Sequence, residues 1–569
     1  MISQHVIQSF LRAILIAICA ITIANTAAAQ SRPNVVLIMT DDQGWGDLGM
    51  NGNDKIRTPR LDGLARQSVV FDRFYVSPVC APTRACLMTG RYNYRTGVVD
   101  TYIGRAMMHS DEVTIAEMLS AAGYRTGIFG KWHLGDNYPL RPNDQGFEDS
   151  LVHKGGGIGQ PSDPPGGDHY FNPTLYRNGA AEKTEGYCSD IYTTAAIRFI
   201  EQSEDRPFFV YLPFNCPHSP FEIADRYVQP YLETGLDEQT AKIYGMVENI
   251  DENVGRLLDA LEAKDIAENT IVVFLTDNGP NGQRYNGNMR GVKGSVYEGG
   301  IRTACFVRWP TELDAGHRVD QIAAHIDWTP TLLAACGAEP PANVRFDGRN
   351  LLPLLRGDRV DWPERTLYLQ WHRGDQPQPL RAFAAVGQQY KLVQPRGVQP
   401  DANPGDQDLQ LYDLQADASE SRDLSKEMPD RVASMKEDHL AWFRDVSATR
   451  GYDPPRIQLG TPHEDPVVLT RQDWRGPRAG WGDNSLGHWE VKNDEPGTYH
   501  ITVRFAPDES MRTAYFRLGD VEAKGHVNDG ERTHAFHVSL PSGSQRLEAW
   551  LDNGDTTTGV QYVEVAREQ

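Results

Sequence analysis

Continuous apolar runs alternate with amphipathic segments over the first 330 residues of the chain. The runs are four in number, at residues 34–40, 126–129, 207–212 and 270–276. Such runs are typical of strands buried on both faces of a parallel sheet. Segments with apolar residues at helical spacing lie between them, at residues 58–65, 112–119 and 190–199. The alternation predicts an α/β fold, with a doubly wound and mostly parallel sheet flanked by helices over residues 30–350.

The pattern changes twice toward the C-terminus. Short strands are expected at 367–371 and 390–393, and a helix from Pro429 to about Val446, so we place a smaller unit at residues 351–450. Residues 451–462 are rich in Gly and Pro and predict a linker. Beyond it, apolar residues alternate with polar ones and turn signals recur, which predicts an all-β sandwich over residues 463–569.

Residues 1–29 predict a signal peptide. Arg12 precedes an apolar run at 13–23, and small residues up to Ala29 indicate the cleavage site. The run is too short for a membrane span, and Ile18 before Cys19 argues against a lipoprotein. We therefore expect export to the periplasm or beyond, without a stable membrane anchor.

Charge and cysteine content limit the choice of partners. The formal net charge of −21 argues against nucleic acid, which binds to basic surfaces. Seven cysteines, one of them inside the signal peptide, are too few for a scaffold built from disulfides; one bridge is possible, but the sequence does not select it.

Oxygen-bearing side chains follow two of the buried runs. Asp41 and Asp42 end the first, and Asp277 and Asn278 end the last. The carboxyl ends of parallel strands meet where open α/β sheets hold their ligands, and adjacent carboxylates need a cation. Hard oxygen ligands suit calcium or magnesium. An ordinary strand-ending turn is the alternative at each position, but its recurrence favours a metal site.

Basic side chains follow the other strands. Lys131 and His133 come after the second run, His218 after the third, and Lys293 lies among glycines that permit close backbone approach. Each alone is more often a surface residue. Their arrival at one sheet edge indicates a shared site.

Cys80 begins the stretch Cys-x-Pro-x-Arg. Pro82 predicts a helix starting near it, so Cys80 is expected on the preceding turn, at an anion-binding helix N-terminus with Arg84 close by. This suggests a nucleophile in an anion site, and a buried structural cysteine is the alternative.

The run 78–91 resembles the signature of the sulfatase family, arylsulfatase-like members of the alkaline phosphatase superfamily. Gly-Lys-Trp-His-Leu-Gly at 130–135, Pro-His-x-Pro at 217–220 and Lys-Gly-x-x-x-Glu-Gly-Gly-x-Arg at 293–302 match the same family. The resemblance implies that a formylglycine-generating or sulfatase-maturating enzyme converts Cys80 to Cα-formylglycine, whose hydrate is the nucleophile. It also implies a smaller C-terminal antiparallel sheet. The implied calcium ligands are Asp41, Asp42, Asp277, Asn278 and the modified Cys80.

The resemblance also implies individual roles. Calcium, Arg84, Lys131 and Lys293 would neutralise the sulfate, and Lys131, His218 and Lys293 would contact the substrate. His218 with Lys293 would protonate the departing oxygen, and His133 would deprotonate the hydroxyl that remains. Asp277 could accept a proton from the formylglycine hydrate. His372 and Arg373 follow a predicted strand and either line the substrate mouth or lie on ordinary surface.

Two other functions remain open. A phosphodiesterase or phosphonate monoester hydrolase of the same superfamily would share much of this site, and a noncatalytic protein could bind sulfated glycans. The substrate is expected to be a sulfated polysaccharide or oligosaccharide rather than a simple aryl sulfate, because an export signal, a Gly/Pro-rich insertion at 155–167 and the sandwich accompany the core. The sandwich resembles the carbohydrate-binding type. Trp474, Trp481 and Trp489 could stack on sugars, although core packing fits most of them.

Overall fold

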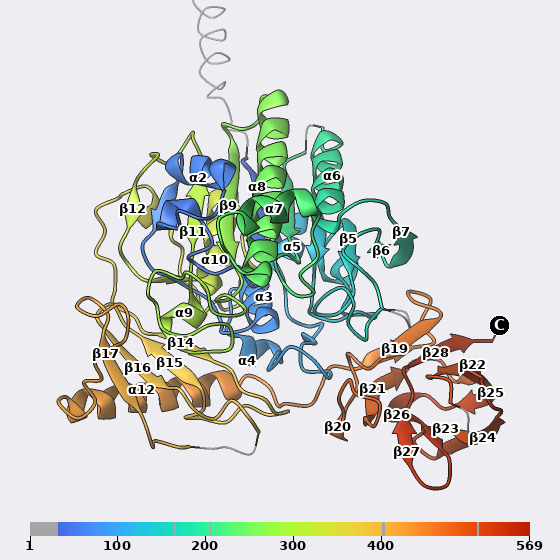
Figure 1. Ribbon diagram of the computed structural model, residues 1–569. Helices are drawn as coiled ribbons and strands as arrows, with labels where there is room; N and C mark the ends of the chain where they lie inside the picture. The colour runs from blue at the N-terminus through green and yellow to red at the C-terminus, as the bar shows by residue number, and fades with distance from the viewer. Residues whose placement is uncertain (1–31, 164–166, 205, 401–403, 509–510, 569) are drawn as a thin grey trace, which may run out of the picture.

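The computed structural model describes residues 32–163, 167–204, 206–400, 404–508 and 511–568. The predicted signal peptide at 1–29 lies outside the described residues. A ten-stranded sheet forms the centre, in the order β12-β2-β11-β9-β1-β8-β4-β5-β6-β7 (Figure 1). Its strands are β1 (Asn34–Thr40), β2 (Val69–Phe71), β4 (Arg125–Lys131), β5 (Asp149–His153), β6 (Thr174–Arg177), β7 (Ala180–Lys183), β8 (Phe208–Pro213), β9 (Thr270–Thr276), β11 (Cys305–Arg308) and β12 (Arg318–Val319).

The middle of this sheet is parallel, as the apolar runs predict. Strands β9, β1, β8, β4 and β5 all run in the same direction. Antiparallel pairs join β11 to β9 on one side and β6 to β5 on the other. The fold class is therefore confirmed, with antiparallel strands added at both edges.

Successive residues of each central strand face opposite helical layers, which is why the runs are continuously apolar. Val35, Leu37 and Met39 pack with one layer, whereas Val36 and Ile38 pack with the other. The first layer holds α3 (Cys80–Thr89), α5 (Ile115–Ala121), α10 (Trp328–Cys336) and α11 (Leu352–Leu355). The second holds α2 (Pro59–Arg66), α6 (Cys188–Glu201) and α8 (Glu238–Ala263). The sheet is thus covered on both sides.

Helix boundaries differ from the predicted ones by a few residues. Helix α5 begins after Thr114, which forms a capping box with Glu117, rather than at Glu112. Helix α3 begins at Cys80 itself, not near Pro82. A proline is tolerated in the first turn because the amide it lacks has no partner there in any case. Shorter helical pieces are α4 (Asn93–Thr96), α7 (Asp225–Leu232), α9 (Glu298–Ile301) and three 3₁₀ turns, η1 (Gly49–Asn51), η2 (Pro142–Gln145) and η3 (His325–Asp327).

Two further units lie below the large sheet, at the end where α3 and α4 are found (Figure 1). One is the expected antiparallel sheet, with β14 (Leu367–Gln370), β15 (Phe383–Val386), β16 (Tyr390–Gln394) and β17 (Gln410–Asp413), backed by α12 (Pro429–Ser447). A small sheet joins β10 (Arg302–Thr303), β3 (Phe74–Tyr75) and β13 (Ala323–Ala324). The other unit is the expected sandwich.

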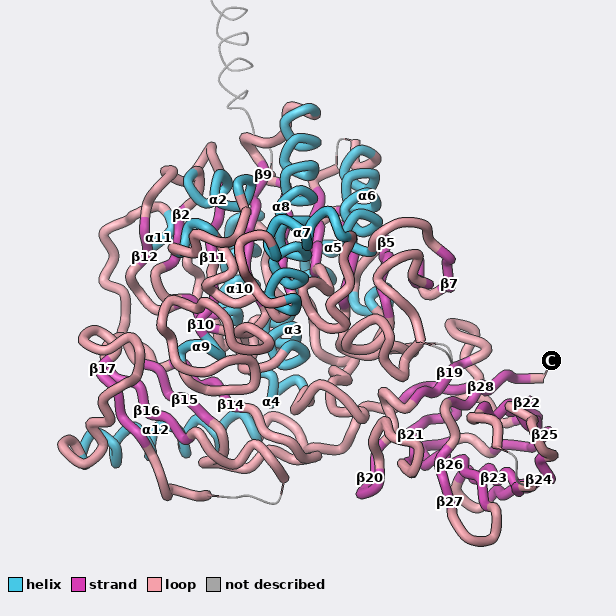
Figure 2. Tube along the Cα trace, viewed as in Figure 1, coloured by secondary structure: helices cyan, strands magenta, loops and turns pink. Residues whose placement is uncertain are grey.

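The sandwich has two sheets that pack around one apolar core (Figure 2). One contains β18 (Ile457–Leu459), β20 (Arg475–Arg478), β21 (Leu486–Asn493), β23 (Arg512–Leu518), β24 (Val521–Val527), β26 (Gly543–Asp552) and β27 (Thr557–Gly559). The other contains β19 (Val467–Thr470), β22 (Gly497–Arg504), β25 (Thr533–Leu540) and β28 (Tyr562–Arg567). Because β18 pairs with β21, three residues of the segment expected to be a linker belong to a sheet.

The sandwich core also takes in side chains from the α/β unit. Ile103, Met107 and Leu140 are buried in the same apolar cluster as the sandwich residues. Hydrogen bonds cross the same boundary, including one of 2.8 Å from the Gly104 amide to the carbonyl of Gln472. The two units therefore pack directly on each other. No helix among the described residues has the length and apolar character that crossing a bilayer requires.

Candidate active site

The oxygen-bearing residues at the ends of β1 and β9 lie together, because those strands are neighbours in parallel register. Thr40 of β1 is paired with Thr276 of β9, so the residues that follow emerge side by side. The Asp42 amide donates to Asp277 Oδ1 at 3.1 Å, and Asn278 Nδ2 donates to Asp42 Oδ1 at 2.9 Å. Asp42 holds a positive φ of 64°, an uncommon conformation for a residue other than glycine that is frequent at functional sites.

Cys80 meets this cluster from the N-terminus of α3. Asp41, Cys80 and Asp277 are buried, and each offers a ligand atom within 4.8 Å of the others. Arg84, one turn along the helix, is completely buried, and its Nη2 lies 2.7 Å from Asp277 Oδ2. Burial raises the pKa of the Cys80 thiol despite the lysines nearby, so the thiol is held in its neutral form.

Two lysines complete a ring of cations around the carboxylates. Lys131, at the end of β4, is buried with its Nζ 2.5 Å from Asp41 Oδ2. Lys293 reaches Asp42 Oδ1 at 2.6 Å from a loop that turns at Gly294, where φ is 81°. Burial opposes the charged forms, but these ammonium groups outweigh it and lower the pKa of both Asp41 and Asp42. Counting Arg84, three fixed cations face Asp41, Asp42 and Asp277, and burial together with the Asp41 charge raises the pKa of Asp277 to about 7.

Two histidines face the same space with defined ring orientations. His133 Nε2 lies 2.7 Å from the Thr101 carbonyl and must donate to it, which leaves Nδ1 as the free acceptor. His218 Nδ1 donates in the same way to the Ser219 carbonyl at 2.6 Å, while its Nε2 lies 3.7 Å from Asp42 Oδ2. Burial lowers the pKa of both rings, so both are neutral near pH 7.

The donor set fits a hard divalent cation. Asp41 Oδ1, Asp42 Oδ2 and Asn278 Oδ1 are buried, and none has a hydrogen-bond partner among the described residues. Buried polar atoms without partners are costly, and a bound cation would satisfy these acceptors. Carboxylate and amide oxygens are what calcium and magnesium prefer. A divalent ion would also turn a balanced site into a positive one that attracts anions.

A cavity of about 270 Å³ opens onto this cluster, lined by Cys80, His133, His218 and Lys293. It is also lined by Gly156 and Gln160 of the Gly/Pro-rich insertion at 155–167, and by Thr101 and Tyr102, to which sequence reasoning gave no role. Thr101 and Tyr102 lie in an irregular loop, where no periodic pattern of the sequence marks a residue as part of a site. Trp481, one of three tryptophans considered for sugar stacking, lines the cavity as well, whereas Trp474 and Trp489 are buried in the sandwich core.

His372 does not lie where a substrate contact would require. It is buried, with Nδ1 bonded to the Arg373 carbonyl and Nε2 accepting from the Gln378 amide, and it is not part of the cavity wall. The next residue, Arg373, lines the cavity instead and pairs with Asp100 at 2.7 Å. Of the two residues after this strand, Arg373 lines the cavity and His372 does not.

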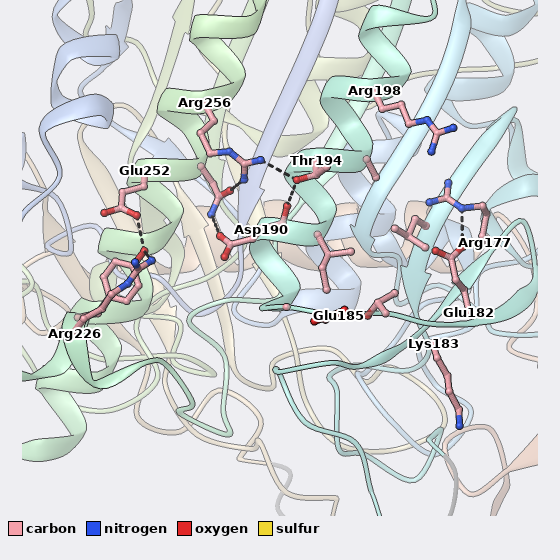
Figure 3. A pocket seen from close by; sticks show the side chains of 17 residues that line it. Arg177, Glu182, Lys183, Glu185, Asp190, Thr194, Arg198, Arg226, Glu252 and Arg256 are labelled. Carbon is pink, nitrogen blue, oxygen red and sulfur yellow. Dashed lines mark hydrogen bonds and ion pairs between the residues drawn. The ribbon is translucent and has the colours of Figure 1, made fainter.

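A second, larger cavity of about 600 Å³ lies between α6, α8 and the β6–β7 hairpin. Figure 3 shows that charged residues on its wall face each other, such as Arg177 with Glu182 at 2.9 Å, and that Arg256 donates to Thr194 at 2.8 Å. No member of the Cys80 cluster lines it. Among the charged residues of its wall, Arg177 and Glu182 form an ion pair, and we assign no chemistry to the cavity.

Comparison with known proteins decides the family. The model of the Sulfatase family matches residues 33–338, more than half of the chain, and the model "N-sulphoglucosamine sulphohydrolase, C-terminal" matches residues 292–441. The chain belongs to the sulfatase family. It is a sulfuric ester hydrolase, and the two matches cover the large sheet and the four-stranded sheet with α12.

Individual relatives agree with this membership. The sulfatase is 33% identical to mouse N-acetylgalactosamine-6-sulfatase over 366 residues, covering 59% of this chain and 69% of the relative. It is 33% identical to human arylsulfatase A over 371 residues, covering 59% and 70%. The crystal structure of Ps i-CgsB in complex with k-i-k-neocarrahexaose is similar with a TM-score of 0.65 and 29% identity, covering 73% of this chain and 93% of that one.

Proposed function

We propose that this sulfatase removes sulfate from a sulfated polysaccharide or its oligosaccharides after export, using formylglycine made from Cys80 and a calcium ion. The convergence of Cys80 with three buried oxygens that lack hydrogen-bond partners carries the proposal. Asp41, Asp42, Asp277 and Asn278 would hold the ion together with the modified residue 80. The hydrate of formylglycine would supply a reactive hydroxyl nucleophile, and the calcium ion would supply positive charge beside the sulfate.

The unmodified cysteine is poorly suited to be the nucleophile. A thiol attacks as thiolate, and burial raises the pKa of Cys80 away from that form. The surrounding cations do not reverse this effect, because Asp41 and Asp277 lie beside them and act in the opposite direction. The site is equipped for anions but keeps the thiol neutral. A chemical change at residue 80 would remove this conflict. Such a change requires a maturation enzyme as partner.

Charge neutralisation falls to side chains held in place by the carboxylates. Lys131 is buried against Asp41, and Lys293 is partly exposed to the cavity against Asp42. Arg84 is fixed by Asp277 and by the Lys131 carbonyl at 3.0 Å. Donors positioned in advance stabilise developing charge without reorganisation, which is the largest contribution in many acyl and phosphoryl transfers. We assign the same role here toward the sulfuryl oxygens.

Proton transfer falls to the histidines and Lys293. Burial opposes the charged form of Lys293, but Asp42 raises its pKa, so Lys293 is protonated at neutral pH. Lys293 and His218 both lie against Asp42, which places a proton source and a relay at one side of the cavity for the departing sugar oxygen. His133, with Nδ1 unprotonated, is suited to act as the base.

Mass spectrometry of the Cys80 peptide tests the proposal. Material from an exporting host that has the maturation enzyme should show formylglycine, and an unmodified thiol in enzyme that still releases sulfate would refute the mechanism. The Cys80→Ala variant should fold, retain some calcium binding and lose turnover. Parallel rates on sulfate and phosphate esters of the same alcohol separate a sulfatase from a phosphodiesterase, and faster phosphate cleavage would overturn the assigned substrate class.

A further inference from the structure

Trp481 of the sandwich lies in the wall of the catalytic cavity although it is far from the catalytic residues in sequence. It lines the same space as Cys80, His218 and Lys293. Its side chain remains 38% exposed, whereas the sandwich tryptophans 474 and 489 are fully buried. An exposed aromatic ring in a cleft is a typical ligand platform, and tryptophan is enriched at such positions.

A buried arginine, Arg471, donates hydrogen bonds to the loop that carries Trp481. Arg471 donates to the carbonyl of Gly482 at 2.9 Å, and to those of Val560 at 2.9 Å and Gly559 at 2.8 Å. Its guanidinium is therefore committed to main-chain carbonyls. The Trp481 ring meets Tyr102 edge to face, with centroids 5.4 Å apart. Anchoring on both sides orients the ring before any ligand arrives, which reduces the entropic cost of binding.

A further cavity, here called the outer cavity, adjoins the catalytic one. It measures about 210 Å³ and shares Gln160 and Trp481 with the first. Gln160 accepts from the Gly156 amide at 3.1 Å. The outer wall belongs to the sandwich, through Asp483, Gln561 and Tyr562. The two cavities are therefore adjacent, and Trp481 lines both of them.

The outer cavity differs from the inner one in charge. Its acidic side chains are Asp163 and Asp483, and the guanidinium on its wall is that of Arg471, which already serves three carbonyls. No lysine lines it within the described part of the chain. The Arg471 guanidinium interacts electrostatically with the Asp483 carboxylate, so the wall has no net positive charge with which to bind a second sulfate, whereas its carboxyl groups accept hydrogen bonds from sugar hydroxyls.

We propose that the sandwich completes the substrate cleft: Trp481 stacks on the sugar next to the sulfated one, and the outer cavity selects an unsulfated sugar there. This inference rests on the proposed sulfatase action on glycans and specifies which glycans fit. The substrate class is an oligosaccharide in which the reactive sulfated sugar adjoins a neutral one.

Steady-state kinetics on matured, full-length enzyme test the proposal. The variants are Trp481→Ala and Trp481→Phe, with Trp550→Ala as the matched control, because Trp550 stacks on Tyr515 on the sandwich at 5.0 Å and lines neither cavity. The probes are 4-nitrophenyl sulfate, sulfated monosaccharides, and di- to tetrasaccharides from chondroitin sulfate, heparin and κ- and ι-carrageenan. Unfolding temperatures check that each variant is folded.

We expect Trp481→Ala to lose about tenfold or more of kcat/KM on oligosaccharides, mainly through KM, and less than about twofold on probes that end at the first sugar. Trp481→Phe should recover part of the loss, and Trp550→Ala should match wild type. Oligosaccharides with a neutral neighbour should be preferred over those sulfated on both sugars. Equal losses on short and long probes, or preference for the doubly sulfated neighbour, would overturn the inference while the sulfatase activity stands. Absence of sulfate release from every probe by matured wild type would instead refute the proposed function.

Discussion

Neutralising Asp41 separates metal binding from ordinary ion pairing. In the Asp41→Asn variant the side chain keeps its shape but loses its charge. Oδ2 of Asp41 lies 2.5 Å from Lys131 Nζ, and its Oδ1 has no hydrogen-bond partner in the described structure. One oxygen therefore serves an ion pair, and the other is available to a cation. The substitution should affect two quantities that can be measured apart.

The first quantity is stability without calcium. Both side chains of the Asp41–Lys131 pair are 0% exposed, so the variant leaves a buried ammonium without its partner. Removing one member of a buried pair costs about 3–5 kcal/mol. Arg84, 3.7 Å from the same oxygen, adds a second cation without compensation. We expect a loss of about 3 kcal/mol or more in chelator.

The second quantity is the increase in the free energy of unfolding when calcium is added. A ligand that binds only the folded state at about 100 times its Kd contributes about 2.7 kcal/mol, or a rise of roughly 2–3 °C in the unfolding temperature of a chain this long. The wild type should show this increment, and Asp41→Asn should lose most of it. Calorimetric titration with calcium after treatment with chelator gives the affinity directly.

Asp47 provides a matched control. It is buried beside the site, but its two oxygens already accept from the Gly44 amide at 2.8 Å and from Arg284 at 2.9 Å. Asp47→Asn should lower stability in chelator through the loss of the Arg284 pair and yet keep the calcium increment. If Asp41→Asn retained the wild-type increment, or if Asp47→Asn lost it to the same extent, the assignment of the three oxygens to a cation would be wrong.

Two further predictions concern proton transfer and pH. His218→Ala should slow sugar sulfates about 100- to 10,000-fold but slow 4-nitrophenyl sulfate far less, because a nitrophenolate leaves without a proton; equal slowing of both would exclude His218 from leaving-group protonation. Burial raises the pKa of Asp163 to about 7, so the folded state binds its proton more tightly than the unfolded chain, and stability should fall as pH rises from about 4 to 7. Asp163→Asn should flatten this part of the stability curve in urea unfolding, and an unchanged difference between pH 5 and pH 8 would contradict the assigned environment.

The sequence is informative about the site because many of the candidate residues directly follow the carboxyl ends of strands. Asp41 and Asp277 follow runs that are apolar at every position, and such runs belong to central parallel strands whose carboxyl ends converge. A linear pattern thus predicts a three-dimensional cluster. Lys131 and His218 follow the same rule. Cys80 does not end a strand, but the helix that begins there brings it to the same point.

No such rule applies to the cavity residues to which sequence reasoning gave no role. Thr101 and Tyr102 lie in a loop without periodic pattern, so their placement depends on tertiary packing alone. His372 and Arg373 are adjacent, and which of them faces the cavity depends on backbone geometry after β14 that no spacing reveals. The start of the sandwich was placed too late for a related reason. Ile457 to Leu459 is too short a run to show alternation, and its strand exists because β21 offers it a partner.

The sandwich is joined to the catalytic apparatus through a shared acceptor. The Thr101 carbonyl accepts from His133 Nε2 at 2.7 Å and from Gln472 Nε2 of the sandwich at 3.3 Å. Ile103, two residues further on, is buried in the sandwich core. The loop that fixes the tautomer of His133, the proposed base, is thus folded between the two units. Removal of the whole sandwich would disturb this histidine and expose an apolar surface, so loss of activity in a truncated chain would not distinguish a binding role from a stabilising one. The substitution of one exposed ring, Trp481, leaves that packing in place, and this is why the substrate question is best put to a single side chain.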